Sequence, residues 1–589
     1  MTTDKKIILD VSADNLDEFR KAAERAKAAG ATHVMVGNMP RSRWMWDVDL
    51  TDPYPNWCMG HAQLFKLVCP PQLKEYLPTD FIDQCFNLVK DRCDILNSLG
   101  LKGALFSNEP FWLPEEVYLK HPYWRGARCD HPRRSKRTYY SPCIDNPEVL
   151  EMYRYAVREL VSKTGIDFIT FMSNDSGGGL CWSNGTYIGP NGPESCRTRS
   201  MSERILGFMD ALDAGARDAG VDITLSFNAN IGFKIAEEGV AEAWRGAKDN
   251  YIINLRDNKG GYPIDFRHRE GKGWIKGIPN LFGFAQSVGS SLTSGREFVT
   301  LLLPKTDFEE NWSYLQDNYK NAPSNWAGYV SAVRKVAVEL AGEDAADLLT
   351  DAFYYIGEGE LHFSHDGLGL IMYGVIHQRW INRPFVLFPD ELKPEDRDYY
   401  RRFQFQALDE KHANDLLDMQ NIECARGFSA AFLLSETARR ATASFNKAIG
   451  LLEQLIEKKP ALKDKASMLI RRLKIYNCLM KTCSNAALFQ DLVDNIDFEA
   501  EPPLECRWPT RNEPRIEQFQ NITRSEVENA YKLADLLEGY ESELFSVTDE
   551  ANEDIFTFGP NLTAQIRRKA EIMLSRELDV NRVLERHNI

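Results

Sequence analysis

The chain has 589 residues, of which 43% are hydrophobic and 27% charged, a composition typical of a folded globular protein rather than a disordered, fibrous or membrane-embedded one. This length exceeds the roughly 250–300 residues at which one hydrophobic core usually stops growing, so more than one domain is expected. A formal net charge of −15 opposes binding to nucleic acid or to anionic lipid, so neither nucleic acid nor a membrane is expected as a partner.

Short β-branched or aromatic runs alternate with helical patterns through the first half of the chain. The expected strands are KKIILDV, THVMVGN, LKGALFSNEP, DFITFMSND, DITLSFNAN and YIINLRDN. Helices are expected between them, over residues 15–30, 81–99, 147–163, 202–219 and 236–246. This alternation predicts parallel βαβ units.

Such units close either as an open doubly wound sheet or as an eight-stranded (β/α) barrel. A dinucleotide-binding sheet carries a glycine fingerprint after its first strand, whereas this strand runs into VSADNLDEF, which favours the barrel. LFGFAQSVG and FVTLLLP are the candidates for the remaining strands, although GELHFSHDGLGLIMYGVI also has a partly extended pattern. The predicted fold is α/β, with a (β/α)8 TIM barrel over residues 1–394.

After about residue 394 the hydrophobic period becomes helical almost throughout, for example in ATASFNKAIGLLEQLIEKK and DKASMLIRRLKIYNCLMKTC. No repeat of fixed period is evident, which favours a packed helical domain over a solenoid. We therefore expect an all-α C-terminal domain over residues 395–589. Its expected role is structural support or assembly of a homodimer.

Polar residues stand where the expected strands end, and in (β/α) barrels the reacting groups lie at these ends. The candidates for substrate binding among them are Asn38, Asn108, Asn174, Asn228, Asn230, Arg256 and Lys259. Three carboxylates, Glu109, Asp175 and Asp257, occur at the same kind of position. A salt-bridged structural role is the alternative for each of them.

Two carboxylates across a cleft are the minimal equipment for cleaving a glycosidic bond, because one protonates the leaving oxygen while the other attacks or activates water. We predict Asp175 as the proton donor and Glu109 as the nucleophile or base. Asp257 is a third candidate that could pair with Asp175 across the barrel. Retention and inversion both stay open, because the sequence does not give the distance between the carboxylates.

Tryptophans gather in or beside the expected βα loops, and their flat faces suit the apolar face of a sugar ring. They are Trp44, Trp46, Trp57, Trp112, Trp124, Trp182 and Trp274, of which Trp46, Trp112 and Trp182 are predicted to bind substrate. Packing in the protein core is the alternative for each one.

A basic segment follows Glu109 in this otherwise acidic chain. It contains Arg125, Arg128, Arg133, Arg134, Lys136 and Arg137, with His121 and His131 close by. Because arginine matches the geometry of carboxylate and sulfate groups, His121 and Arg125 are predicted to bind an anionic sugar such as a uronate. A solvated loop or one that faces another subunit is the alternative.

The segment FMSNDSGGGLCWSNG places Asp175, the glycines 177–179 and Trp182 in one short loop. Glycines allow the backbone to approach a bulky ring closely, and Trp182 could stack on that ring. A phosphate-binding loop is the rival interpretation, but the Lys and Ser/Thr that follow a Walker glycine run are missing here.

Several of these segments together resemble a known group of proteins. LFSNEPFWLPEEVYLKHPYWRG, YYSPCIDNPEVLEMYRYAVREL, FITFMSNDSGGGLCWSNG and HQRWINRPFVLFPDEL are similar to segments of bacterial polysaccharide-degrading barrel proteins, distant relatives of α-glucuronidases and β-hexosaminidase-type glycoside hydrolases. The resemblance covers roughly residues 1–400. It implies a (β/α)8 barrel, no organic cofactor and acidic residues at strand ends, with Asp175 at the place where such barrels often present a general acid.

This sequence differs from the pattern of these proteins at two positions. Asp175 is followed by Ser176, where many of these proteins have a glutamate or an Asp-Glu pair. Glu109 lies in an NEP motif that is similar to the acid/base motif of another large glycosidase clan, but one strand too early.

The sequence therefore predicts a glycoside hydrolase whose partner is a carbohydrate and which needs no cofactor or metal. A non-catalytic carbohydrate-binding protein on a degenerate barrel is one alternative. A divalent-metal isomerase or lyase is another, although only His362 and His365 of the ten histidines are close together.

The cysteines and the N-terminal residues bear on the compartment. The twelve cysteines form no CxxC pair and are expected to be reduced, although Cys181 and Cys196 could form a zinc half-site or a disulfide. MTTDKKIILDVSADNL has no apolar segment of signal-peptide length, so a cytoplasmic location is expected, or a periplasmic or secreted one if a leader has been removed.

Overall fold

The computed structural model describes residues 5–37, 52–55, 58, 62–110, 112–129, 138–172, 199–228, 234–254, 275–365, 380–403, 428–499, 514–547 and 558–585. The chain divides into two compact units. The first consists of Met1–Arg269, Phe284–Lys305 and Asn311–Ala332, and the second of Glu270–Gly283, Thr306–Glu310 and Val333–Ile589. The domain boundary predicted at residue 394 stays a prediction.

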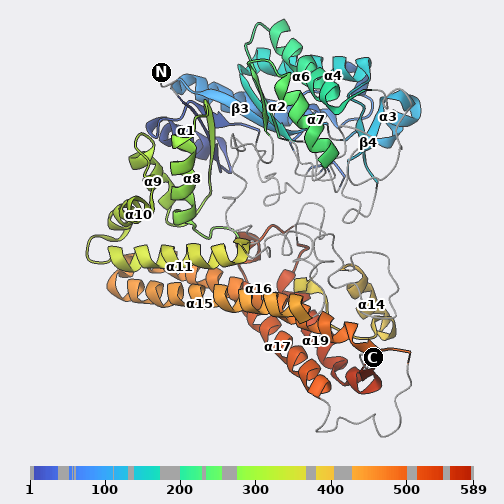
Figure 1. Cartoon of the computed structure of the whole chain (residues 1–589), viewed down its shortest axis with the longest axis vertical. Helices are drawn as coiled ribbons and strands as arrows, with labels where there is room; N and C mark the ends of the chain where they lie inside the picture. The colour runs from blue at the N-terminus through green and yellow to red at the C-terminus, as the bar shows by residue number, and fades with distance from the viewer. Residues whose placement is uncertain are drawn as a thin grey trace. The chain divides into compact units, whose positions relative to one another are not determined.

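A seven-stranded parallel sheet forms the centre of the first unit, in the order β8-β7-β6-β3-β2-β1-β9 (Figure 1). Its strands are β1 (Lys6–Val11), β2 (His33–Met35), β3 (Lys102–Asn108), β6 (Phe168–Met172), β7 (Thr224–Asn228), β8 (Tyr251–Asn254) and β9 (Phe298–Leu303). The six predicted strands and FVTLLLP are thereby confirmed, and so is their parallel arrangement. The prediction of a strand at LFGFAQSVG is wrong, because these residues belong to helix α8 (Leu281–Thr293).

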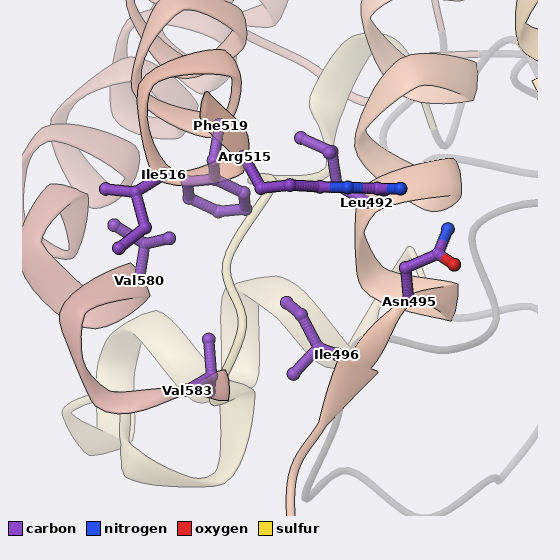
Figure 2. A pocket seen from close by; sticks show the side chains of 8 residues that line it. All are labelled: Leu492, Asn495, Ile496, Arg515, Ile516, Phe519, Val580 and Val583. Carbon is purple, nitrogen blue, oxygen red and sulfur yellow. The ribbon is translucent and has the colours of Figure 1, made fainter. Parts of the chain in front are cut away.

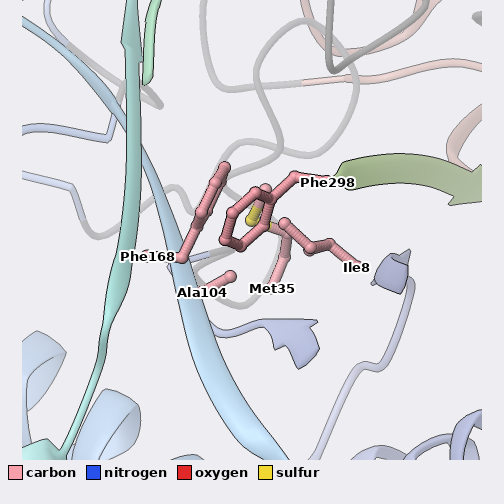
Figure 3. Packing of buried hydrophobic residues seen from close by; sticks show 5 residues of the cluster. All are labelled: Ile8, Met35, Ala104, Phe168 and Phe298. Atoms are coloured by element: carbon pink, nitrogen blue, oxygen red, sulfur yellow. The ribbon is translucent and has the colours of Figure 1, made fainter. Parts of the chain in front are cut away.

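The sheet is strongly curved. The rings of Phe168 on β6 and Phe298 on β9 stack with centroids 4.9 Å apart, although three strands lie between β6 and β9 in the sheet. In a flat sheet, four strand spacings of about 4.8 Å would separate them by roughly 19 Å. The two rings therefore lie on a concave face, where they form one buried cluster with Ile8, Met35 and Ala104 (Figure 3). Closure into an eight-stranded barrel remains a prediction, because β8 and β9 are the two ends of the described sheet.

Helices cover the convex face of the sheet (Figure 1). They are α1 (Leu16–Ala28), α2 (Thr79–Leu99), α4 (Pro147–Thr164), α6 (Met201–Asp218) and α7 (Lys234–Arg245). Their ends follow the local sequence: Asn146 caps α4 by accepting from Glu148 N, and a capping box of Ser200 and Glu203 begins α6. Gly215 on α6 faces the backbone of Arg154 on α4, where an added Cβ would lie 2.3 Å from a carbonyl oxygen, so these helices pack closely.

A small excursion follows β3. It contains α3 (Glu115–Lys120) and an antiparallel hairpin of β4 (Arg125–Arg128) and β5 (Tyr140–Pro142). The basic segment of the sequence therefore begins on β4. Its remaining residues, 130–137, lie outside the described residues.

The second unit is mainly helical. Its long helices are α11 (Ala346–His365), α15 (Phe428–Lys458), α16 (Lys463–Asp494), α17 (Pro514–Leu537) and α19 (Leu562–Ser575), and shorter ones are α14 (Pro394–Arg401) and α18 (Glu541–Leu544). Helices α9 (Glu310–Asn318) and α10 (Trp326–Ala341) come between β9 and α11 in the chain. The predicted helical character is confirmed, but an antiparallel pair, β10 (Ile496–Asp497) and β11 (Leu584–Glu585), is also present, so an all-α domain is not confirmed.

Two further features bear on the sequence-based expectations. Among the described residues no helix is long and apolar enough to cross a membrane. The eight cysteines in this part of the chain form no disulfide bond with one another, and six of them are buried, in agreement with their expected use as small apolar residues. Cys181 and Cys196 lie outside the described residues.

Candidate active site at the carboxyl ends of the strands

The last residues of four neighbouring strands lie side by side at the carboxyl edge of the sheet. The strand register pairs Asn108 with Met172, Met172 with Asn228, and Asn228 with Asn254. Asn108 and Asn228, both predicted to bind substrate, thus stand in one row at the carboxyl ends of β3 and β7. The other residues predicted at strand ends or in the following loops lie outside the described residues: Asn38, Trp46, Asn174, Asp175, Trp182, Asn230, Arg256, Asp257 and Lys259.

The alternation of side chains along β3 decides which residues face the concave side. Ala104 belongs to the buried cluster on that side and Phe106 packs against it, so Asn108, two residues further on, shares this face. Asn108 is 2% exposed, and within the described part of the chain its Oδ1 has no hydrogen-bond partner. A buried amide oxygen without a partner is unfavourable, and a ligand hydroxyl at this position would satisfy it.

Asp10 on β1 is a candidate that the sequence interpretation missed. Ile8 belongs to the buried cluster on the concave face, and Asp10, two residues further along the strand, lies on the same face. The side chain is partly exposed, in contrast to the buried Leu9 and Val11 on either side of it. A carboxylate thus stands on the concave face toward the carboxyl end of β1.

Glu109 lies on the opposite side of β3. Its Oε1 accepts hydrogen bonds from Leu64 N (2.6 Å) and Ser107 Oγ (2.7 Å), and its Oε2 accepts one from Tyr153 Oη (3.0 Å). Tyr153 is a buried residue of α4, which packs on the convex face, so the carboxyl points toward the helices. Glu109 is only 2% exposed.

The electrostatics of Glu109 follow from this burial. Removal from water raises its pKa to about 7, and the hydrogen bonds from Leu64, Ser107 and Tyr153 oppose part of that rise. Near neutral pH the carboxyl is therefore protonated in a large share of the molecules. A nucleophile must be ionised and must reach the substrate. The position of Glu109 argues against this role, which stays a prediction.

Three further predicted residues lie in the excursion after β3. Trp112 packs against a buried cluster of Tyr54, Cys58, Cys129 and Tyr139, with its ring centroid 5.8 Å from that of Tyr54. His121 stacks on Trp124 (3.9 Å between centroids, 7° between planes), and Arg125 lies over the Tyr140 ring at 4.9 Å. The structure brings these residues into one region, and their role in substrate binding stays a prediction.

Trp124 itself is buried, and its Nε1 donates a hydrogen bond of 2.6 Å to Glu148. Its ring is engaged on one face by His121, so packing accounts for its presence.

The segment between β2 and α2 is held by a buried ion pair. Lys66 Nζ lies 2.8 Å from Asp52 Oδ2, donates to the Cys58 carbonyl at 2.7 Å and sits 4.4 Å from the centre of the Tyr54 ring. Both charged side chains are almost fully buried. This pair fixes the backbone that leads to Leu64, the residue whose N–H reaches Glu109.

A separate cavity in the second unit has a different character. It is lined mainly by apolar side chains: Leu492, Asn495, Ile496, Arg515, Ile516, Phe519, Val580 and Val583 (Figure 2). Few polar groups converge on it, whereas a sugar-binding site needs several hydrogen-bonding partners. Among the described residues no cluster of His, Cys, Asp and Glu has a geometry that could hold a metal ion.

Comparison with known proteins concerns the fold. No protein-family model matches the sequence, and no curated protein matches it either. Among solved structures, a GH138 enzyme targeting pectin rhamnogalacturonan II matches with a TM-score of 0.53 and 10% identity, over 97% of this chain and 67% of that one. A GH36 α-galactosidase from Geobacillus stearothermophilus matches with a TM-score of 0.28 and 12% identity, over 55% of this chain and 43% of the enzyme.

The first match shows a shared fold over almost the whole chain, whereas the second score is too low to add to it. The resemblance to barrel-type glycoside hydrolases, expected from sequence, is thereby confirmed at the level of the fold.

Proposed function

We propose that the protein is a glycoside hydrolase that cleaves glycosidic bonds in a poly- or oligosaccharide. The observation that carries this proposal is the polar concave edge of the sheet, with Asp10 and Asn108 on one face, in a fold shared with a polysaccharide-degrading enzyme over 97% of the chain. Fold alone does not determine activity, so the chemistry of the strand ends supplies the second support. Carboxylates and amides at these ends suit the binding and protonation of sugar oxygens.

We assign the reacting pair to Asp175 and Asp257, with Asp175 as the proton donor. The sequence also offers Glu109, but its carboxyl is buried on the helix-facing side of β3, and this favours the pair across the barrel. Asp10 and Asn108 then bind sugar hydroxyl groups. Asp10 accepts their hydrogen bonds as a carboxylate, and Asn108 accepts through its amide oxygen.

The proposed substrate contains a uronic acid. The basic segment 125–137 supports this, because arginine pairs with carboxylates in a bidentate manner. The GH138 enzyme of similar fold targets pectin rhamnogalacturonan II, which also points to an acidic polysaccharide. Hydrolysis of a uronate-containing glycan should therefore exceed that of its neutral counterpart and weaken as salt screens the arginines.

The test is hydrolysis of oligosaccharides from pectin that contain galacturonate, compared with neutral galacto-oligosaccharides, with products detected by mass spectrometry. We expect acidic products, and a loss of turnover of about 10²–10⁴ in Asp175→Asn and in Asp257→Asn with unchanged folding, since each removes a positioned acid or base. Asp218→Asn, a substitution at the exposed end of α6, is the control and should keep wild-type turnover.

Two results would contradict the proposal. Binding of the acidic oligosaccharides with no product release would indicate a non-catalytic carbohydrate-binding protein. Full turnover in Asp257→Asn together with a loss in Glu109→Gln would return Glu109 to the reacting pair.

A further inference from the structure

Glu109 and its neighbour Asn108 hold the same short segment of the chain from two sides. The backbone N–H of Asn108 donates to the Ala62 carbonyl at 2.8 Å, and the Glu109 carboxyl accepts from Leu64 N at 2.6 Å. The N–H of Glu109 also donates to the Met172 carbonyl at the end of β6 (3.0 Å). Three segments thus meet at the carboxyl end of β3: residues 62–64, the end of β6 and, through Tyr153, helix α4.

The two residues face opposite sides of the strand. Asn108 presents its unpartnered amide oxygen on the concave face. Glu109 accepts a hydrogen bond from Tyr153 of helix α4 on the convex face. Because successive side chains alternate, any shift of Glu109 along or about the strand also moves Asn108. The contacts of Glu109 therefore control the position of a group that faces the proposed substrate.

We propose that Glu109 is a positioning residue that clamps residues 62–64 and helix α4 to the end of β3, and thereby holds Asn108 in place for a sugar hydroxyl. This inference rests on the proposed function, because the hydroxyl belongs to the proposed substrate. It gives Glu109 a role in substrate affinity through another residue, with no contact to the reacting atoms.

The chemistry of the clamp explains why a carboxyl occupies this position. Its two oxygens accept from three neutral donors, the Leu64 N–H and the hydroxyls of Ser107 and Tyr153. An alanine would remove the acceptor shared by these three donors and leave Ser107 Oγ with only its longer contact to the Ala62 carbonyl at 3.5 Å. A glutamine would satisfy them, because its carbonyl oxygen can accept from Leu64 and Ser107 while its NH₂ donates to the Tyr153 oxygen.

The experiment compares Glu109→Ala, Glu109→Gln and a matched control, using galacturonate-containing pectin oligosaccharides as the substrate. The control is Glu360→Ala on α11, since Glu360 is also a buried carboxyl (4% exposed) whose pKa burial raises to about 7, and it belongs to the second unit. We expect Glu109→Ala to raise KM about tenfold, which corresponds to the loss of one hydrogen bond to substrate. The kcat of this variant should stay within about threefold of wild type. Glu109→Gln should restore KM to within about threefold, and Glu360→Ala should leave KM unchanged.

A milder variant keeps the test decisive if Glu109→Ala does not fold. Tyr153→Phe removes only the donor to Oε2 and should raise KM in the same direction by about threefold, less than the loss of all three contacts. A loss of kcat of about 100-fold in Glu109→Gln would show that Glu109 is catalytic and would overturn the proposal. An unchanged KM in Glu109→Ala and Tyr153→Phe would reduce Glu109 to a purely structural residue.

Hydrogen exchange separates this inference from the proposed function, because it needs no substrate. Peptides that cover residues 62–66 and 104–108 should exchange faster in Glu109→Ala than in wild type, and at wild-type rates in Glu360→Ala. If wild type hydrolyses none of the oligosaccharides, the proposed function fails, and faster exchange still supports the clamp. Unchanged exchange in Glu109→Ala would refute the clamp even in an active enzyme.

Discussion

Two buried glutamates, one in each unit, satisfy their carboxyl groups in different ways. Glu109 at the end of β3 meets only neutral donors, and burial raises its pKa to about 7. Glu526 on α17 is fully buried too, but its Oε1 lies 2.6 Å from the ammonium of Lys569 on α19. Hydrogen bonds from neutral groups therefore offset only part of the rise in pKa that burial causes at Glu109, whereas the Lys569 ammonium gives Glu526 a partner of opposite charge.

Glu526 also accepts hydrogen bonds from two neutral side chains. Thr482 Oγ1 donates to Oε1 at 2.8 Å, and Asn485 Nδ2 donates to Oε2 at 2.7 Å. Lys569 also donates to the Trp380 carbonyl at 2.8 Å, although burial lowers its pKa. The network joins α16, α17 and α19, so the packing of these helices depends on a charge pair, while the clamp at Glu109 does not.

The largest expected effect on stability follows from removing Lys569, the charged partner of Glu526. Lys569→Met leaves Glu526 as an uncompensated buried charge and should lower the free energy of unfolding by about 3–5 kcal/mol, measured by urea denaturation. Lys532→Met, on the exposed side of α17, is the control and should change stability by less than about 0.5 kcal/mol. Replacing Glu526 and Lys569 together by methionine should cost less than Lys569→Met alone. Equal losses in Lys569→Met and Lys532→Met would remove the distinction between the two glutamates.

An intermediate effect is expected in the pH dependence of Glu109. Its pKa is about 7 in the folded state and about 4.3 in an unfolded chain, so between these values only the folded state holds the proton. Stability from this group is therefore present at low pH and is lost as the pH rises toward 7. Glu109→Gln removes the dependence, so its stability relative to wild type should rise by up to about 3 kcal/mol between pH 4 and pH 8.

Urea denaturation at pH 5, 6, 7 and 8 measures this difference. Glu115→Gln, at an exposed carboxyl on α3, is the control and should show a nearly constant difference from wild type. A constant difference for Glu109→Gln as well would mean that neutral donors are enough to keep Glu109 ionised.

The smallest effect is expected at a partly exposed ion pair. Glu391 accepts from Arg582 at 2.5 and 2.7 Å and from Arg576 at 2.9 Å, and these contacts, that with Arg582 first, lower its pKa to about 2. The side chain is 38% exposed, so water screens the interaction, and Glu391→Gln should cost only about 0.5–1 kcal/mol. The contribution is present above about pH 4 and is lost as the pH falls toward 2.

Salt provides the check on this last prediction. In 0.5 M NaCl the cost of Glu391→Gln should shrink, while that of Lys569→Met stays nearly the same, because buried charges are screened much less. A cost for Glu391→Gln that does not change with salt would show that packing, rather than charge, holds this pair.

Most of the sheet could be predicted from sequence, because β-branched runs of strand length alternate with capped helices. The failure at LFGFAQSVG has a physical cause: apart from Gln286, the 13 residues of α8 are apolar or small, so their periodicity does not separate a buried strand from a buried helix. Length was the better guide, since 13 residues exceed a typical strand. The excursion with β4 and β5 has short strands and no regular pattern, so the sequence does not predict these two strands.

The site was harder to predict, since both faces of a parallel sheet are covered and its strands are apolar on both sides. On β3 the residues Leu105 and Ala104 are both fully buried, so nothing in the sequence tells which face is concave. The sequence therefore predicts Glu109 and Asn108 in the same site, although adjacent residues of a strand face opposite sides. Asp10 was missed for the same reason, within the apolar run IILDV.

The pairing of β1 with β9 has a consequence for how the chain folds as it is synthesised. Six consecutive residues of β1 pair with β9, from Lys6 with Phe298 to Val11 with Leu303. The ribosome must therefore release slightly more than half of the chain before β1 meets its second neighbour, and until then one edge of β1 has open hydrogen-bonding groups. Contacts between residues so distant in sequence slow folding, so this edge of β1 stays open until the residues of β9 have been synthesised.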